Sequence, residues 1–171
     1  MGKGPGMDIA DLILEDHHRQ RRAFAVLDDT HADDLARLGA IWGDLAAFLE
    51  THAAAEEKVL YPEVLKLSDP DASETKDAIG DHNDIRDAIA VAQTRAAGTA
   101  GWWQAVGAAR SANTEHMGEE EDDVLPAFRR RAGVELRVRL GVAFEAAKST
   151  SSAQELDISD KDPEQYVNER T

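Results

Sequence analysis

The stretch that decides the fold is 52-HAAAEEKVLYP-62, because a second version of it follows later in the chain. Residues 116–126 read HMGEEEDDVLP, again with a carboxylate four residues after the histidine and a proline ten residues after it. Residues four apart on a helix lie on one face, with Cβ atoms about 5–6 Å apart. One helix can therefore present an imidazole and a carboxylate together, and two such helices can face each other around a metal.

The repeat extends upstream of both stretches. Residues 16–26 read DHHRQRRAFAV and residues 81–91 read DHNDIRDAIAV, so both begin with Asp-His and have Arg four residues after that histidine. His17 precedes His52 by 35 residues, and His82 precedes His116 by 34. This near-constant period indicates a helix pair that is used twice. The alignment also favours His17 over His18 as the meaningful histidine.

Apolar residues at three- and four-residue spacing predict helices over about 8–28, 33–61, 73–96 and 102–130. The inner stripe of each helix carries one histidine, and no segment alternates with a period of two. Short polar connections then predict an all-α, antiparallel up-down four-helix bundle. We expect Pro62 to kink or end the second helix.

The domain boundaries follow from the same pattern. Residues 8–148 form the predicted bundle domain, which ends in a short fifth helix over 134–148. Residues 1–7 look like a flexible leader, and residues 149–171 like an acidic tail with few side chains to bury, of which we expect residues 152–171 to be mobile or to lie on the surface.

The composition restricts the partners and the chemistry. A formal charge of −15 and a pI near 4.7 argue against nucleic acid or an anionic membrane as partners. The absence of cysteine excludes disulfides, thiolate metal sites and a cysteine nucleophile. No signal peptide or membrane-spanning apolar run is evident, which favours a cytoplasmic protein.

A lone histidine on an apolar stripe is usually a core residue with a satisfied hydrogen bond. Here four stripes each carry one at matched positions, and two of them add a carboxylate, Glu56 or Glu120. Burying these carboxylates without partners would cost several kcal/mol each, roughly, and a metal removes that cost. Four imidazoles and two carboxylates exceed the needs of one tetrahedral zinc and favour two bridged first-row ions, iron in particular. Ferritin-like bundles use Glu-x-x-His twice, whereas this chain has it once, so that family is excluded.

The order His, His-x-x-x-Glu, His, His-x-x-x-Glu resembles the hemerythrin-like, HHE cation-binding domain over roughly residues 9–130. The resemblance implies two irons with an oxo or hydroxo bridge inside a four-helix bundle. It implies His17 and His52 on one iron, His82 and His116 on the other, and bridging by Glu56 and Glu120.

Two departures from the oxygen-carrying hemerythrins bear on function. Arg86 stands where they have a second third-helix histidine, and Glu121 occupies the position of their last carboxylate, beside Glu120. Repeat symmetry favours Glu120, with Glu121 as the alternative. Fewer imidazoles favour a centre that reacts with hydrogen peroxide, nitric oxide or both. The alternatives are a protein that binds oxygen reversibly, senses it or stores iron without turnover, and a structural bundle that holds zinc.

Several further residues have more than one interpretation. Tyr61 has no counterpart in the repeat, where Leu125 stands, and we expect it to pack unless Pro62 distorts the turn enough to bring it to iron. Arg21 and Arg86 are either cations close to the metal ligands or solvent-facing. The carboxylates expected to form a solvated face are Glu57, Glu119, Asp122 and Asp123, and the histidines expected at the surface are His18 and His31.

Overall fold

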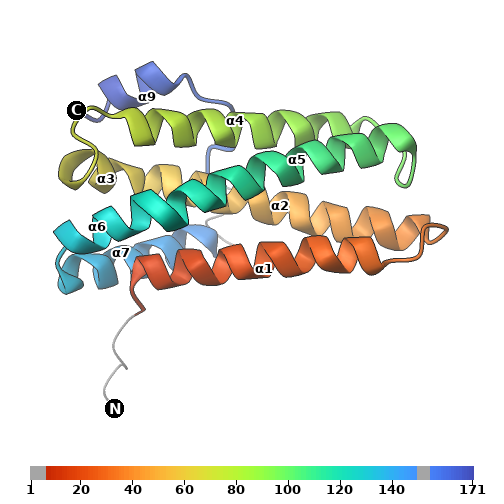
Figure 1. Cartoon of the computed structure of the whole chain (residues 1–171), viewed down its shortest axis with the longest axis horizontal. Coiled ribbons are helices and arrows are strands. Elements are labelled where there is room, and N and C mark those ends of the chain that lie inside the picture. The colour runs from red at the N-terminus through yellow and green to blue at the C-terminus, as the bar shows by residue number, and fades with distance from the viewer. Residues whose placement is uncertain (1–6, 150–154) are drawn as a thin grey trace, which may run out of the picture.

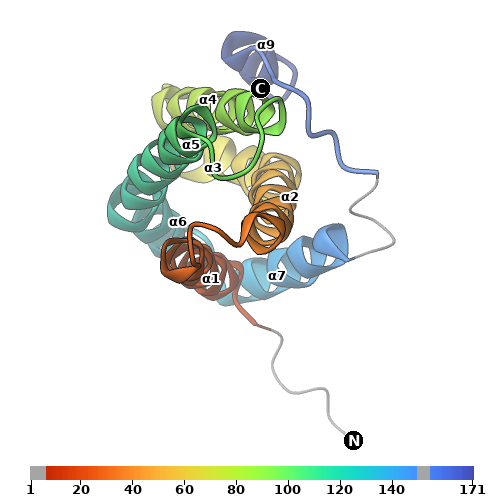
Figure 2. The same cartoon turned by 90° about the vertical axis from the view of Figure 1, so that its right-hand side faces the viewer.

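The structure, a computed structural model, describes residues 7–149 and 155–171. Its four long helices are α1 (Ile9–Asp29), α2 (Leu35–Val59), α4 (Ser73–Gln93) and α5 (Ala100–Glu119). They run lengthwise beside one another in Figure 1 and form a ring when seen end-on in Figure 2. No strand occurs in the described part of the chain, so the predicted all-α bundle is confirmed.

The helices begin where the sequence supplies side-chain caps. The side chain of Asp8 accepts from the N–H of Ala10 at the start of α1, and that of Asp34 accepts from Arg37 at the start of α2. Such caps satisfy backbone donors that have no partner within the helix. Within the described residues, no helix combines the length and apolar character needed to cross a bilayer.

Two prolines interrupt the helices that carry the His-x-x-x-Glu pairs. Helix α2 ends at Val59 and the chain continues as α3 (Tyr61–Leu67), with Pro62 in the first turn. Helix α5 passes into the π-helical segment η1 (Glu120–Val124) and then into α6 (Leu125–Arg131). A proline removes one backbone donor and its ring clashes with the preceding turn. The expected break at Pro62 is therefore confirmed, and its counterpart near Pro126 takes a different form.

The predicted fifth helix is present as α7 (Val134–Lys148), which packs against α1 and α2. Its backbone lies very close to the start of α1. A Cβ atom added at Gly141 would lie 2.0 Å from the carbonyl oxygen of Met7, so only glycine fits there. This close approach brings Phe144 into the core.

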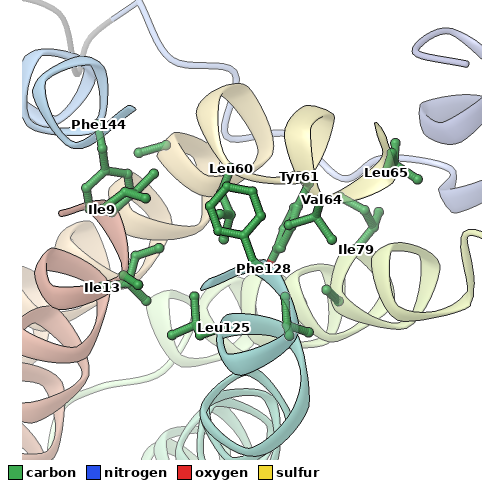
Figure 3. Packing of buried hydrophobic residues seen from close by; sticks show 14 of the residues in the cluster. Ile9, Ile13, Leu60, Tyr61, Val64, Leu65, Ile79, Leu125, Phe128 and Phe144 are labelled. Atoms are coloured by element: carbon green, nitrogen blue, oxygen red, sulfur yellow. The ribbon is translucent and has the colours of Figure 1, made fainter. Parts of the chain in front are cut away.

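The bundle has two hydrophobic clusters. One joins α1, α3, α6 and α7, and Figure 3 shows Phe128 among Ile9, Leu60, Tyr61 and Leu125. The other fills the opposite end of the bundle, where Trp42 and Trp102 meet edge to face. The buried histidines of all four long helices lie between the two clusters. The site is thus enclosed by apolar packing at both ends.

The described part of the predicted tail, residues 155–171, lies against the outside of the bundle. Helix α9 (Pro163–Asn168) packs on α4, outside the ring in Figure 2, and buries Tyr166 and Val167. The Nδ2 group of Asn83 on α4 also donates to the carbonyl of Lys161 at 2.7 Å. Residues 150–154 of the expected tail and residues 1–6 of the expected leader lie outside the described residues.

Candidate metal centre

The six predicted ligands converge at the middle of the bundle. Helix α1 contributes one, α2 two, α4 one, α5 one and η1 one, and each is almost fully buried: His17, His52, Glu56, His82, His116 and Glu120. Their ligand atoms form two groups within which all atoms lie no more than 4.8 Å apart. One group contains His17, His52, Glu56 and Glu120, and the other contains Glu56, His82 and His116. We call these six the inner residues.

Both inner carboxylates lie between the two groups. Glu56 Oε1 is 2.9 Å from Nε2 of His52, and Glu56 Oε2 is 3.3 Å from Nε2 of His82. Glu120 Oε2 is 3.3 Å from Nε2 of His17 and 3.7 Å from Nε2 of His116. Each carboxylate thus faces imidazoles of both groups, as a bridging carboxylate would. The placement of Glu120 in η1, at the start of the π turn, brings it into this position.

The inner atoms fit a metal because their lone pairs lack partners. Nε2 of His17 and of His52, both oxygens of Glu56 and Oε2 of Glu120 are buried without a hydrogen bond. Nε2 of His82 and Nε2 of His116 face each other at 3.0 Å. Buried polar atoms without partners are costly, and nitrogen and carboxylate oxygen donors are the ligands that first-row metals bind. The donor set therefore fits two cations.

The outward nitrogens of the four histidines each face a carboxylate. The Nδ1–oxygen distances are 2.9 Å for His17 with Glu121, 2.9 Å for His52 with Asp16, 2.8 Å for His82 with Glu57 and 3.4 Å for His116 with Asp81. We call these four acids the outer carboxylates. A carboxylate on Nδ1 orients the ring and leaves Nε2 as the metal-binding nitrogen.

The outer carboxylates obey the sequence repeat. Asp16 and Asp81 directly precede the first histidine of each half and contact the second histidine of the same half, His52 or His116. Glu57 and Glu121 directly follow the inner glutamate and contact a histidine of the other half. The doubled Glu-Glu and Asp-His dipeptides were the signal in the sequence that could have identified them.

This arrangement corrects the expectation for Glu57 and places Glu121. Glu57 is 2% exposed and contacts His82, so it does not belong to a solvated face. Glu121 lies outside the inner residues, on Nδ1 of His17. The remaining expectations agree with the structure, since the residues predicted at the surface are exposed: Glu119, Asp122, Asp123, His18 and His31.

Cations neutralise three of the outer carboxylates. Arg86 is 6% exposed, and its Nη2 donates to Oε1 of Glu57 at 2.8 Å, while Lys161 lies 2.8 Å from the other oxygen. Arg21 pairs with Glu121 at 2.9 Å, and Lys148 of α7 pairs with Asp16. Both repeat arginines therefore contact outer carboxylates, and Arg86 is not solvent-facing. Asp81 contacts no lysine or arginine within residues 7–149 and 155–171.

Tyr61 points toward the centre, although its place five residues after Glu56 in the sequence would put it off the inward face of a continuous helix. Its hydroxyl donates to Oε1 of Glu120 at 2.8 Å, and its side chain is fully buried. An ideal helix would direct Tyr61 away from Glu56, but α2 ends at Val59 and Tyr61 begins a new helix, α3, after the break at Leu60. Burial raises the pKa of the phenol well above its usual value, and the carboxylates of Glu120 and Glu56 raise it further.

The inner residues are also strongly coupled electrostatically. Burial lowers the pKa of His52, but the carboxylates of Glu56 and Asp16 outweigh burial and raise it to about 9. Burial raises the pKa of Glu56, yet contacts with His52, His116 and His82 bring it well below its usual value. A cation that binds His52 would therefore compete with a proton for the imidazole.

Comparison with known proteins gives one match. The family model described as the hemerythrin HHE cation-binding domain matches residues 8–128, which include all six inner residues. No curated protein and no solved structure matches the chain.

Proposed function

Because the chain belongs to the hemerythrin HHE cation-binding domain family, we propose that it is a non-haem di-iron protein that reacts with hydrogen peroxide, nitric oxide or both. Membership in this family makes it a metal-binding helical bundle. The identity of the metal as iron, the pair of ions with an oxo or hydroxo bridge, and the reaction belong to the proposal, as does a cytoplasmic location. The inner residues support it, because they form two groups that share Glu56. Bound iron would supply Lewis-acid and redox chemistry at this site.

The observation that carries the proposal is the position of Arg86. The resemblance to oxygen carriers places a further imidazole there, but this guanidinium contacts Glu57 and not an inner residue. The chain therefore offers four imidazoles for two cations, which favours a centre with room for an external ligand. The near-complete burial of the inner residues favours a small molecule such as peroxide, nitric oxide or oxygen as that ligand.

Residues of the chain also hold protons close to this ligand position. The Tyr61 hydroxyl keeps its proton, because its pKa is raised, and directs it at Glu120. A buried hydroxyl at this place can donate to a ligand oxygen when Glu120 shifts toward a metal. A phenolate bound directly to iron is the alternative role for Tyr61, and its spectrum separates the two.

The test begins with metal analysis, in which two irons per chain are expected. The di-ferric protein is then mixed with hydrogen peroxide while oxygen release is followed. Two peroxide molecules give two of water and one of oxygen, so no further reductant is needed. With nitric oxide present, one peroxide molecule oxidises two of nitric oxide to two of nitrous acid. In parallel, the di-ferrous protein is exposed to oxygen and then degassed.

The outcomes separate the alternatives. Oxygen release or nitrite formation that requires bound iron supports the proposal. A stable oxygen adduct that reverses on degassing, without peroxide turnover, would replace it with the carrier interpretation. Zinc in place of iron, without any redox reaction, would leave only a structural metal bundle.

A further inference from the structure

A cavity of about 250 Å³ lies between α4 on one side and α5 with η1 on the other. Its lining includes two inner residues, His116 and Glu120, so it reaches the candidate metal centre from the side of the bundle. Four more carboxylates line it, from α4 (Glu74 and Asp77) and from α5 and η1 (Glu119 and Asp123). We call these four the acidic rim.

The acidic rim lacks positive partners. Within residues 7–149 and 155–171, none of its four carboxylates forms a hydrogen bond or an ion pair. Oε2 of Glu74 is buried and still has no hydrogen-bond partner. Partial burial raises the pKa of Glu74, and repulsion from Asp69, Asp123 and Asp71 raises it further, against a lowering effect of Arg131. A bound cation would reduce the electrostatic repulsion among these carboxylates.

Among the outer carboxylates of the candidate metal centre, the one on the side of this cavity, Asp81, is the least neutralised. Asp16, Glu57 and Glu121 each contact a lysine or an arginine, whereas Asp81 does not within the described part of the chain. Asp81 lies on α4 one turn after Asp77 and faces Nδ1 of His116. At the floor of the cavity, the side chain of Glu120 is 1% exposed, and its Oε2 atom has no hydrogen-bond partner. Within the described residues, carboxylates without a lysine or arginine in contact thus continue from the rim to the floor, where Oε2 of Glu120 faces the imidazoles of His17 and His116 at 3.3 and 3.7 Å.

We propose that this cavity is the route by which divalent metal cations load the centre. The acidic rim captures a hydrated cation such as Fe²⁺, and Glu120 and His116 receive it from the cavity. A cleft lined by one sign of charge concentrates oppositely charged ligands and accelerates their association. The two apolar clusters close the ends of the bundle to a hydrated ion. The inference rests on metal binding by the inner residues and does not depend on peroxide chemistry.

The test measures loading and not turnover. Apo-protein is mixed with ferrous iron under anaerobic conditions, and protein-bound iron is determined against time after rapid desalting. The variant Glu74→Gln/Asp77→Asn/Glu119→Gln/Asp123→Asn neutralises the rim. The matched control, Asp29→Asn/Asp33→Asn/Asp44→Asn/Asp87→Asn, removes the same charge from exposed aspartates outside this cavity.

We expect the rim variant to load about tenfold more slowly, because its focusing field is lost, and to reach the same final iron content. The control should load within about twofold of the parent protein, since its charges do not line the cavity. Loading of the parent should also slow with salt, as screening shortens the Debye length from about 10 Å at 0.1 M to about 3 Å at 1 M.

Three results would overturn the inference. Unchanged loading in the rim variant would show that cations enter elsewhere, and equal slowing in the control would reduce the effect to net charge. A lower final iron content would make rim residues ligands and not a route. If circular dichroism shows that the fourfold variant does not fold, two other measurements test the route: the loading rate of Glu74→Gln and the salt dependence of the loading rate of the parent. A loading rate that changes neither with this substitution nor with salt would reject the route. Because no peroxide is used, failure here is separate from failure of the proposed reaction.

Discussion

The two halves of the repeat supply nearly identical ligands but different surroundings. The half formed by α1, α2 and α3 places Tyr61 at the centre, and Lys148 of α7 contacts its Asp16. The half formed by α4, α5, η1 and α6 has Leu125 in place of Tyr61 and leaves Asp81 without a lysine or arginine in the described structure. The repeat thus provides matching candidate ligands in both halves, while single differences such as Tyr61 against Leu125 and the contact of α7 with Asp16 give the two halves different surroundings.

The largest expected effect tests the distinction between inner and outer carboxylates. Glu56→Ala should lose most of the iron of both groups, because Glu56 belongs to both. Glu57→Ala should weaken iron affinity about 10–100-fold, since it only orients His82. Glu119→Ala, the exposed neighbour of Glu120, should keep its equilibrium iron content. Metal analysis after dialysis against a graded chelator measures all three, and equal loss would show that the inner and outer positions are misassigned.

Metal removal tests whether the centre joins the two halves. Iron held about a thousandfold above its Kd adds about 4 kcal/mol, which corresponds to a fall of about 10 °C in Tm on removal. Calorimetry of the protein before and after chelation measures the shift. The same treatment of Glu56→Ala is the control and should change its Tm little. An unchanged Tm in the parent protein would mean that the bundle is held by its two apolar clusters alone.

The two repeat arginines give a matched pair of smaller effects. Arg86→Leu should cost about 2 kcal/mol of unfolding free energy, because it removes a buried charged hydrogen bond from Glu57. The side chain of Arg21 is 41% exposed, so Arg21→Leu should cost less than about 1 kcal/mol. Denaturant unfolding of both variants measures the difference. Equal losses of unfolding free energy in the two variants would contradict the asymmetry between the two halves.

The smallest effect on stability concerns Tyr61. Tyr61→Phe keeps the packing and loses one hydrogen bond to Glu120, at about 1 kcal/mol. If the phenolate binds iron, the parent has a phenolate-to-iron charge-transfer band in the visible spectrum that the variant lacks. If Tyr61 acts as a proton donor, both spectra agree and only the rate with peroxide falls. A variant with the spectrum and the peroxide rate of the parent would show that Tyr61 contributes only to packing.

Much of the fold was predictable, because helical periodicity and the repeat report the same four helices. The prediction also brought together the six inner residues, since His and Glu at apolar stripe positions point to one face. It missed Glu57, because periodicity assigns one face per helix. In a bundle, a residue about 100° from the centre lies in the interface with the next helix, where it meets His82.

The position of Tyr61 and of residues 155–171 depended on information that periodicity lacks. Pro62 indicated a break, but not that Tyr61 would then join Leu60, Val64 and Phe128 in one buried cluster and reach Glu120. The C-terminal segment has an acidic composition, and its anchors are too few and irregularly spaced to form a stripe: Leu156, Tyr166 and Val167. Its attachment also uses Lys161, whose partner Glu57 was expected to be solvated.

The close contact at Gly141 has a consequence for mutational tolerance. Alanine is normally the mildest replacement within a helix, yet here its methyl group would collide with the Met7 carbonyl and force α7 outward. Helix α7 carries both Lys148, which holds Asp16, and Phe144, whose ring lies 5.8 Å from that of His52. A conservative substitution in a peripheral helix would therefore disturb His52, one of the inner residues, without touching it.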